Sequence, residues 1–128
     1  MNLLLDTCGL LALAGGAGKL PARAAQAISD ADQIFVGAVS AWEIAIKARS
    51  GKLRLSCPVR DWFAEALSRY HLEEIALSSG LLCEAADLPP IHRDPFDRVL
   101  VAMALEQNLA IITSDRIIPG YPGVRVIW

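Results

Sequence analysis

Short apolar segments alternate along this chain with segments of helical pattern, and this alternation restricts the possible folds more than any other feature. Short runs rich in Leu, Ile and Val are typical of strands buried on both faces of a parallel sheet. They occupy residues 2–6, 33–37, 72–77, 109–113 and 124–128, of which 72–77 is the weakest because two glutamates dilute it. Strands separated by helices indicate crossover units. The sequence therefore predicts a three-layer α/β/α fold with a central, mostly parallel sheet.

Helix caps and turn residues delimit the segments between these strands. Proline favours the first turn of a helix and glycine follows the last turn, which is where we place Pro21, Pro58 and Gly51. Asp94 before Pro95 marks the start of the most strongly patterned helix. The predicted helices span residues 7–14, 21–30, 41–50, 58–70, 78–86 and 94–108. With 128 residues and no long linker, residues 1–128 are predicted to form one domain.

Four acidic residues stand at the boundaries of these elements. Asp6 and Asp115 follow apolar strands, while Glu43 and Asp97 lie in the first turns of predicted helices. In parallel sheets, ligands bind beyond the carboxyl ends of the strands. Asp6 interrupts an apolar run, where an unpaired carboxylate is unfavourable, and a divalent cation shared with the other acids would compensate it. The pattern predicts a site for Mg²⁺ or Mn²⁺, in which an acidified water attacks a phosphodiester.

Each of these acids also has a structural interpretation. Ser40 and Glu43 match the spacing of a capping box, and acids generally favour helix N-termini. Asp94 and Asp97 show a similar spacing. For Asp94 we favour the N-cap of the helix over metal binding, although both acids can face one side of the helix.

The segments around the four acids resemble, in chain order, the four acidic segments of PIN-domain proteins in the form found in VapC-type toxins. The matching segments are residues 3–10, 39–44, 92–104 and 113–115. The resemblance implies a PIN-like fold and a metal-dependent endoribonuclease. It implies that Asp6, Glu43 and Asp97 are the core metal ligands and catalytic acids. It implies that Asp115 is a fourth acid supporting a second ion.

The resemblance also implies partners and accessory groups. Thr7 and Thr113 match hydroxyl positions that orient carboxylates or water at the substrate site. The substrate would be a structured RNA such as tRNA or rRNA, and the chain would form a homodimer that a cognate antitoxin inhibits. Hydrophobic residues make up 54% of the chain, which fits either an apolar partner surface or simply a well-filled core. The helices at 7–14 and 21–30 are candidates for a partner groove.

Basic residues are few, and the formal net charge of −2 excludes a globally basic nucleic-acid binder. Arg93 and Arg98 flank the third acidic segment and are candidates for contact with RNA phosphates. The alternative for Arg98 is an ion pair with Asp94, four residues earlier, and Lys47 stands in the same relation to Glu43. The predicted chemistry requires no catalytic histidine, lysine or serine.

Cysteine usage and hydropathy suggest a cytoplasmic protein. Cys8, Cys57 and Cys83 form neither a zinc pattern nor a disulfide framework, so we expect buried free thiols in a reducing compartment. The apolar N-terminal segment lacks a preceding basic residue and contains Asp6, which argues against a signal peptide. No segment reaches the roughly 18 apolar residues of a membrane helix, so no membrane association is expected.

Other functional classes fit the sequence less well. The glycine-rich residues 15–19 are not a phosphate-binding P-loop, because Leu20 replaces the required Ser or Thr. A response-regulator receiver domain needs a Lys after a late strand, where this chain has Ser114 and Asp115. The remaining alternative is a catalytically inactive PIN-like module that binds RNA or protein.

Overall fold

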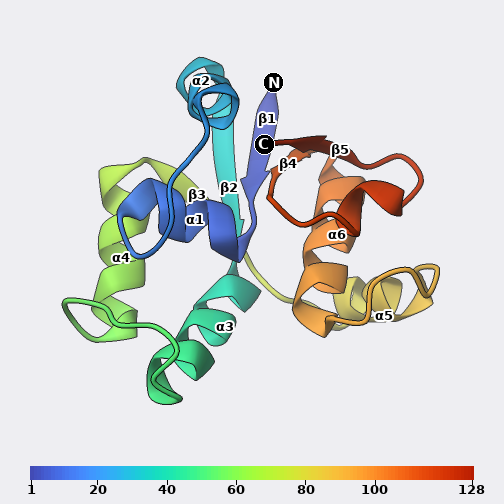
Figure 1. The fold of residues 1–128 in the computed structure, drawn as a ribbon. Coiled ribbons are helices and arrows are strands. Elements are labelled where there is room, and N and C mark those ends of the chain that lie inside the picture. Colours follow the sequence, from blue (N-terminus) through green and yellow to red (C-terminus); the bar gives the residue numbers. More distant parts are fainter.

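A five-stranded parallel sheet with the strand order β3-β2-β1-β4-β5 lies at the centre of the computed structural model, which describes residues 1–128 (Figure 1). Every neighbouring pair of strands is parallel, so the predicted α/β/α fold is confirmed. The elements are β1 (Asn2–Leu5), α1 (Thr7–Ala14), α2 (Ala22–Asp30), β2 (Gln33–Gly37), α3 (Ala38–Arg49), α4 (Val59–Arg69), β3 (Leu72–Ile75), α5 (Ser79–Asp87), α6 (Pro95–Gln107), β4 (Ala110–Ile112), the 3₁₀ helix η1 (Ile118–Gly120) and β5 (Arg125–Ile127).

The order of the strands reverses at β1. From β1 the chain builds outward to β2 and β3 on one side, and then returns to place β4 and β5 on the other. The central strand therefore pairs with β2 and with β4, with Leu5 beside Val36 and Ile112. Such a reversal leaves a crevice beyond the carboxyl ends of the strands, where open α/β sheets bind ligands. Asp6 follows β1 directly and lies at this crevice.

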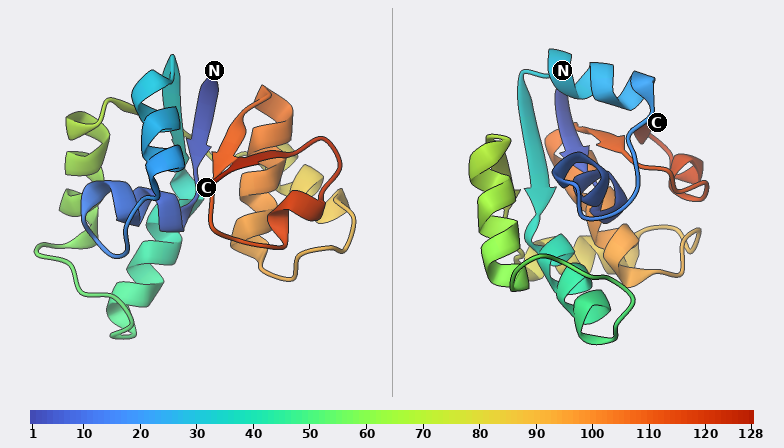
Figure 2. Two further views of the ribbon diagram at one scale, coloured as in Figure 1. Left: turned by 45° about the horizontal axis from the view of Figure 1, so that its top comes forward. Right: turned by 60° about the vertical axis from the view of Figure 1, so that its left-hand side comes forward.

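Helices cover both faces of the sheet (Figure 2), and an apolar core lies on each face. Successive residues of a strand point to opposite faces, so Leu3 and Leu5 join a core with α1, α2 and α4, whereas Leu4 joins the core with α5 and α6. Helix α3 contributes Ile44 to the first core and Val39 to the second. This position beyond the ends of the strands brings α3 to the crevice (Figure 1).

Helix α3 begins earlier than the sequence indicated. It starts at Ala38 directly after β2, and its N-cap, Gly37, provides no side-chain cap. The capping-box interpretation of Ser40 and Glu43 is therefore wrong, and Glu43 lies in the second turn rather than the first. At this junction a Cβ at Gly37 would lie 2.8 Å from the Met103 sulfur, so the glycine lets the end of β2 pack closely against the Met103 side chain of α6.

The expectation of buried thiols is also wrong. Cys8, Cys57 and Cys83 are all free, but all three are exposed. In α1 and α5 the core positions are taken by neighbours such as Leu10 and Leu81, which leaves the cysteines on the solvent side. None of the helices combines the length and the apolar character that a membrane crossing requires.

Candidate active site

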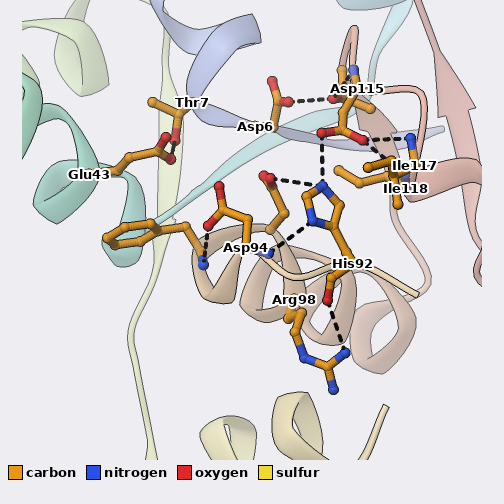
Figure 3. Close-up of polar contacts among 12 residues, drawn as sticks. Asp6, Thr7, Glu43, His92, Asp94, Arg98, Asp115, Ile117 and Ile118 are labelled. Atoms are coloured by element: carbon orange, nitrogen blue, oxygen red, sulfur yellow. Dashed lines mark hydrogen bonds and ion pairs between the residues drawn. The ribbon is translucent and has the colours of Figure 1, made fainter. Parts of the chain in front are cut away.

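The four predicted acids converge on one open, polar cleft at the carboxyl ends of β1 and β4 (Figure 3). With the solvent at its mouth, the cleft has a volume of about 510 Å³. Its lining residues are Asp6, Thr7, Cys8, Glu43, Lys47, Asp94, Asp97, Ser114 and Asp115. Residues far apart in the sequence are thus gathered into a strongly anionic pocket.

Asp6 is the most deeply buried of these acids, with 4% of its surface exposed. Its Oδ1 accepts a hydrogen bond of 2.7 Å from the amide of Gly9, which makes Asp6 the N-cap of α1. Its Oδ2 accepts a hydrogen bond from the Thr113 hydroxyl. Burial raises the pKa of Asp6 to about 6, with further contributions from the charges of Glu43 and Asp115, and the two hydrogen bonds only partly oppose this.

Glu43 is held by α1 and by its own helix. The Thr7 hydroxyl, buried and 3.0 Å from the Ser40 Oγ, donates a 2.6 Å hydrogen bond to Glu43 Oε1. Lys47 Nζ lies 2.9 Å from Glu43 Oε2, so the ion pair expected from their spacing is confirmed. Partial burial by itself lowers the pKa of Lys47, but the contact with Glu43 and the charges of Asp94 and Asp97 raise it overall. Lys47 therefore brings a positive charge into the cleft.

Asp97 and Asp115 meet at a histidine that the sequence did not single out. Asp97 lies in the first turn of α6, as predicted, and Asp115 follows β4. His92 Nε2 lies 3.2 Å from Asp97 Oδ2 and 2.9 Å from Asp115 Oδ2. These three side chains offer ligand atoms that all lie within 4.8 Å of one another.

The two acids beside His92 respond differently to their surroundings. Burial and the charges of Asp94, Asp115 and Glu43 raise the pKa of Asp97, and His92 only partly offsets them. Burial by itself would raise the pKa of Asp115 too. The hydrogen bond from His92 and the amides of Ile117 and Ile118 outweigh it, so the pKa of Asp115 lies below its ordinary value.

Asp94 is the N-cap of α6, as predicted. Its Oδ1 accepts a 2.9 Å hydrogen bond from the amide of Phe96. It also lines the cleft, where its charge contributes to the raised pKa of Asp97.

Arg98 has a different role from the two that its position suggested. It forms no ion pair with Asp94, and its guanidinium donates six hydrogen bonds to the last turn of α5, to the loop that follows it and to Tyr121. The acceptors are the carbonyls of Ala85, Ala86, Leu88, Pro89 and His92 and the hydroxyl of Tyr121. Figure 3 shows the side chain extending away from the carboxylates. Arg98 therefore stabilises the loop that carries His92, and its guanidinium is not free for a phosphate.

The other three residues predicted to contact substrate, Arg93, Thr7 and Thr113, differ in their exposure to solvent. Arg93 is exposed between His92 and Asp94 and remains available for a phosphate. Thr7 and Thr113 are buried, and their hydroxyls donate to Glu43 and Asp6. Both threonines therefore orient carboxylates rather than facing solvent.

The donor set fits a hard divalent cation. Five carboxyl groups line the cleft, and Lys47 is the one basic residue among its lining residues. The repulsion between these carboxylates contributes to the raised pKa values of Asp6 and Asp97. A cation bound between the carboxylates would relieve this repulsion. Oxygen ligands of this kind suit Mg²⁺ and Mn²⁺.

The chain matches the model of the PIN domain family over residues 3–123. It is 31% identical over 113 residues to Ribonuclease VapC22 of Mycobacterium tuberculosis, an alignment that covers 86% of this chain and 85% of the relative.

Solved structures share the fold. A toxin–antitoxin complex from Klebsiella pneumoniae contains a chain with a TM-score of 0.67 and 22% identity, covering 95% of this chain and 94% of that one. For VapC20 of Mycobacterium tuberculosis, described as a Sarcin-Ricin loop cleaving toxin, the TM-score is 0.62 at 16% identity, with 96% and 98% covered. By its sequence matches and its architecture, the chain belongs to the PIN-domain family, and within it to the branch that contains the VapC proteins.

Proposed function

We propose that residues 1–128 act as one catalytic domain, a divalent-metal-dependent endoribonuclease that serves as the toxin of a toxin–antitoxin pair. The observation that carries this proposal is the convergence of Asp6, Glu43, Asp97 and Asp115 on one cleft at the switch point of the sheet. The name of the mycobacterial relative, a ribonuclease, agrees with it. The inactive-module alternative has no such support, because no carboxylate of the set is missing.

The residues of the cleft would have different roles in binding the metal ions. Asp6, Glu43 and Asp97 would hold a first Mg²⁺ or Mn²⁺, and Asp115 would support a second. When bound, such ions activate water and stabilise the charge that develops on a phosphodiester. Thr7 and Thr113 hold Glu43 and Asp6 in place through their hydroxyls.

The positive groups at the cleft would receive the RNA backbone. Arg93 is exposed next to Asp94, and Lys47 lies in the cleft with 42% of its side chain exposed. Cations at these positions supply affinity for phosphates without reading the sequence. We propose Arg93 as the main phosphate contact.

We further propose an antitoxin and a second copy of this chain as protein partners. Toxin–antitoxin complexes are among the solved structures of the same fold. An apolar groove of about 1050 Å³ between α3 and α4, beside the exposed Trp42, offers a surface for such a partner. It lies on other helices than α1 and α2, which the sequence had suggested. Light scattering of the purified chain, alone and with the antitoxin, tests both partners.

Cleavage of a structured RNA by the purified chain tests the catalytic proposal. Cleavage is expected to require Mg²⁺ or Mn²⁺, to stop with a chelator, and to fall roughly 100-fold or more in Asp6→Asn and Asp97→Asn. Asp61→Asn is the matched control, because Asp61 is an exposed acid on α4, outside the cleft. Cleavage that persists in both cleft variants would come from a contaminant or from another site, and the proposal would be wrong.

A further inference from the structure

We propose that His92 is a positioning residue, whose Nε2 donates a hydrogen bond to Asp115, lies 3.2 Å from Asp97 Oδ2 and does not itself ligate the metal. This inference rests on the proposed metal-dependent function. It concerns a residue that no part of the predicted site includes. It also separates two interpretations of one cluster, because the spacing of His92, Asp97 and Asp115 would equally suit three ligands of one ion.

The hydrogen bond at Nδ1 fixes which nitrogen of the neutral ring carries the proton. The Asp94 amide donates to His92 Nδ1 at 3.1 Å. A ring nitrogen that accepts a hydrogen bond carries no proton, so in the neutral imidazole the proton lies on Nε2. A ring turned by 180° would place carbon atoms at the contacts with the Asp94 amide and with Asp115, so the hydrogen bonds fix its orientation.

The contacts at Nε2 agree with that tautomer. Nε2 faces Asp115 Oδ2 at 2.9 Å and Asp97 Oδ2 at 3.2 Å, and ionised carboxylates only accept hydrogen bonds. A nitrogen between two such acceptors is satisfied only as a donor. To ligate an ion through Nε2, the ring would have to carry its proton on Nδ1. That proton would point at the Asp94 N–H, and two donors would face each other.

The backbone of His92 is held as firmly as its ring. The His92 amide donates a 2.8 Å hydrogen bond to the hydroxyl of Tyr121, a residue that is 2% exposed. Arg98 donates to the carbonyl of His92 and to the same tyrosine hydroxyl. Ring and main chain are thus both fixed, as expected for a residue that orients ligands from outside the coordination sphere.

In this arrangement the His92 ring positions the two carboxylates, and the carboxylate oxygens bind the ion. His92 brings one oxygen of Asp97 and one of Asp115 together, although the charges of the two acids repel each other. A carboxylate oxygen that accepts one hydrogen bond keeps lone pairs for an ion. His92 therefore holds Asp97 of α6 and Asp115, which follows β4, in place before the ion binds to their oxygens.

Nitrogen-15 NMR of the histidine rings tests the tautomer directly. The chain contains only two histidines, and His71→Asn removes the other signal. This control suits the site, because His71 is exposed with a φ of 53°, a conformation that Asn tolerates. Spectra are recorded at about pH 8, where an ordinary imidazole is neutral. They are recorded first without metal and then as Mg²⁺ is added stepwise.

The expected result is a proton on Nε2 and an unprotonated Nδ1 in both states. A proton on Nδ1 in the metal-free chain would overturn the inference. Loss of the Nε2 proton as Mg²⁺ binds would overturn it too, because His92 would then be a ligand. Either result leaves the proposed ribonuclease function intact.

A matched pair of variants tests the positioning role. The Gln side chain carries an N–H donor to about the position of Nε2, while Asn is too short for this but can still accept from the Asp94 amide. Calorimetric titration is expected to show Mg²⁺ binding weakened roughly 10- to 100-fold in His92→Asn and largely restored in His92→Gln. Thermal melting without metal shows whether each variant is folded.

Equal Mg²⁺ affinity in the wild type and both variants would overturn the positioning role. Equal losses in both variants would overturn it as well, since the donor at Nε2 would then not be what matters. Absence of Mg²⁺ binding by the wild-type chain is a different result. It would contradict the proposed function itself and His92's part in it.

Discussion

At the scale of single residues, the carboxylate of Asp6 serves the fold and the site at once. An N-cap hydrogen bond contributes about 1 kcal/mol to a helix. The rise of the Asp6 pKa from 3.8 to about 6 corresponds to roughly 3 kcal/mol in favour of the protonated form. The hydrogen bonds from Gly9 and Thr113 are already included in this shift, so at neutral pH the ionised Asp6 costs the metal-free fold stability relative to the protonated form. A cation in the cleft would remove this cost, which is consistent with a site built for binding.

Arg98 gives a prediction that separates a structural arginine from a substrate contact. Arg98→Met removes the donor from several carbonyls of the last turn of α5 and the loop after it, and should lower the free energy of unfolding by roughly 2–4 kcal/mol. Arg93→Met changes an exposed side chain and should leave stability within about 0.5 kcal/mol, but weaken RNA binding. Urea denaturation and RNA binding at fixed ionic strength measure the two effects. An unchanged denaturation midpoint in Arg98→Met would contradict this role.

At the scale of secondary structure, most helices and strands could be predicted because their signals are local. Asp94 and Ser78 cap α6 and α5 through hydrogen bonds to nearby amides, so the sequence reveals both helix starts. The start of α3 could not be predicted in this way. Its N-cap is Gly37, which has no capping side chain, so no local signal marks the helix start.

The distinction between local signals and long-range contacts also explains which residues of the site could be predicted from the sequence. Asp6 and Asp115 were predictable because an acid directly after an apolar strand has a defined place in a parallel sheet. Thr7 and Thr113, whose hydroxyls donate to Glu43 and Asp6, lie beside strand ends as well. His92 was missed because its position depends on a loop without periodicity, held by Arg98 and Tyr121. Spacing along a helix also suggested the wrong partner for Arg98, whose acceptors include carbonyls of the last turn of α5 and of the loop after it.

Two glycines in helices should respond oppositely to the same substitution. A Cβ at Gly9 would lie 2.9 Å from the carbonyl oxygen of Ile112 and 3.3 Å from Asp6 Oδ1, so Gly9→Ala should push α1 away from β4. The nearest atom to a Cβ at Gly80 is the Ser78 Oγ at 4.0 Å. Gly80→Ala should therefore stabilise the chain by about 0.5–1 kcal/mol through helix propensity alone.

Thermal or urea denaturation of both glycine variants measures this contrast. Gly9→Ala is expected to lower the free energy of unfolding by more than 1 kcal/mol. The new Cβ would overlap a backbone oxygen, which cannot easily move, and this clash outweighs the gain of about 1 kcal/mol in helix propensity. Stabilisation by Gly9→Ala would show that α1 is not held as tightly against β4 as these contacts indicate.

At the scale of the whole molecule, the raised pKa values couple stability to pH and to metal. Asp6 and Asp97 bind protons more tightly in the folded chain than in the unfolded chain. Their contribution to stability is therefore fully present below about pH 4 and is lost as the pH rises through the folded pKa, about 6 for Asp6. Without metal, the two acids should lower the melting temperature as the pH rises from about 4 to about 7, the window between their unfolded and folded pKa values.

Calorimetry in a chelator and in Mg²⁺ tests this coupling. At about pH 7.5, Mg²⁺ at 100 times its dissociation constant should stabilise the fold by about 2.7 kcal/mol. Asp6→Asn should reduce the pH dependence and raise the metal-free melting temperature near neutral pH, while the control Asp61→Asn should retain the wild-type slope. A wild-type pH dependence that Asp6→Asn leaves unaltered would rule out this carboxylate as its source.

The pairing of β1 with β4 has a consequence for how the chain is made. Asp6 and Glu43 emerge from the ribosome early, whereas Asp97, β4 and Asp115 belong to the last third of the chain. A nascent polypeptide that lacks these later residues has neither the neighbour that completes the central strand nor the second half of the anionic pocket. During translation the growing chain is therefore unable to assemble its cleft, and any activity of that cleft begins only after residues 97–115 have left the ribosome.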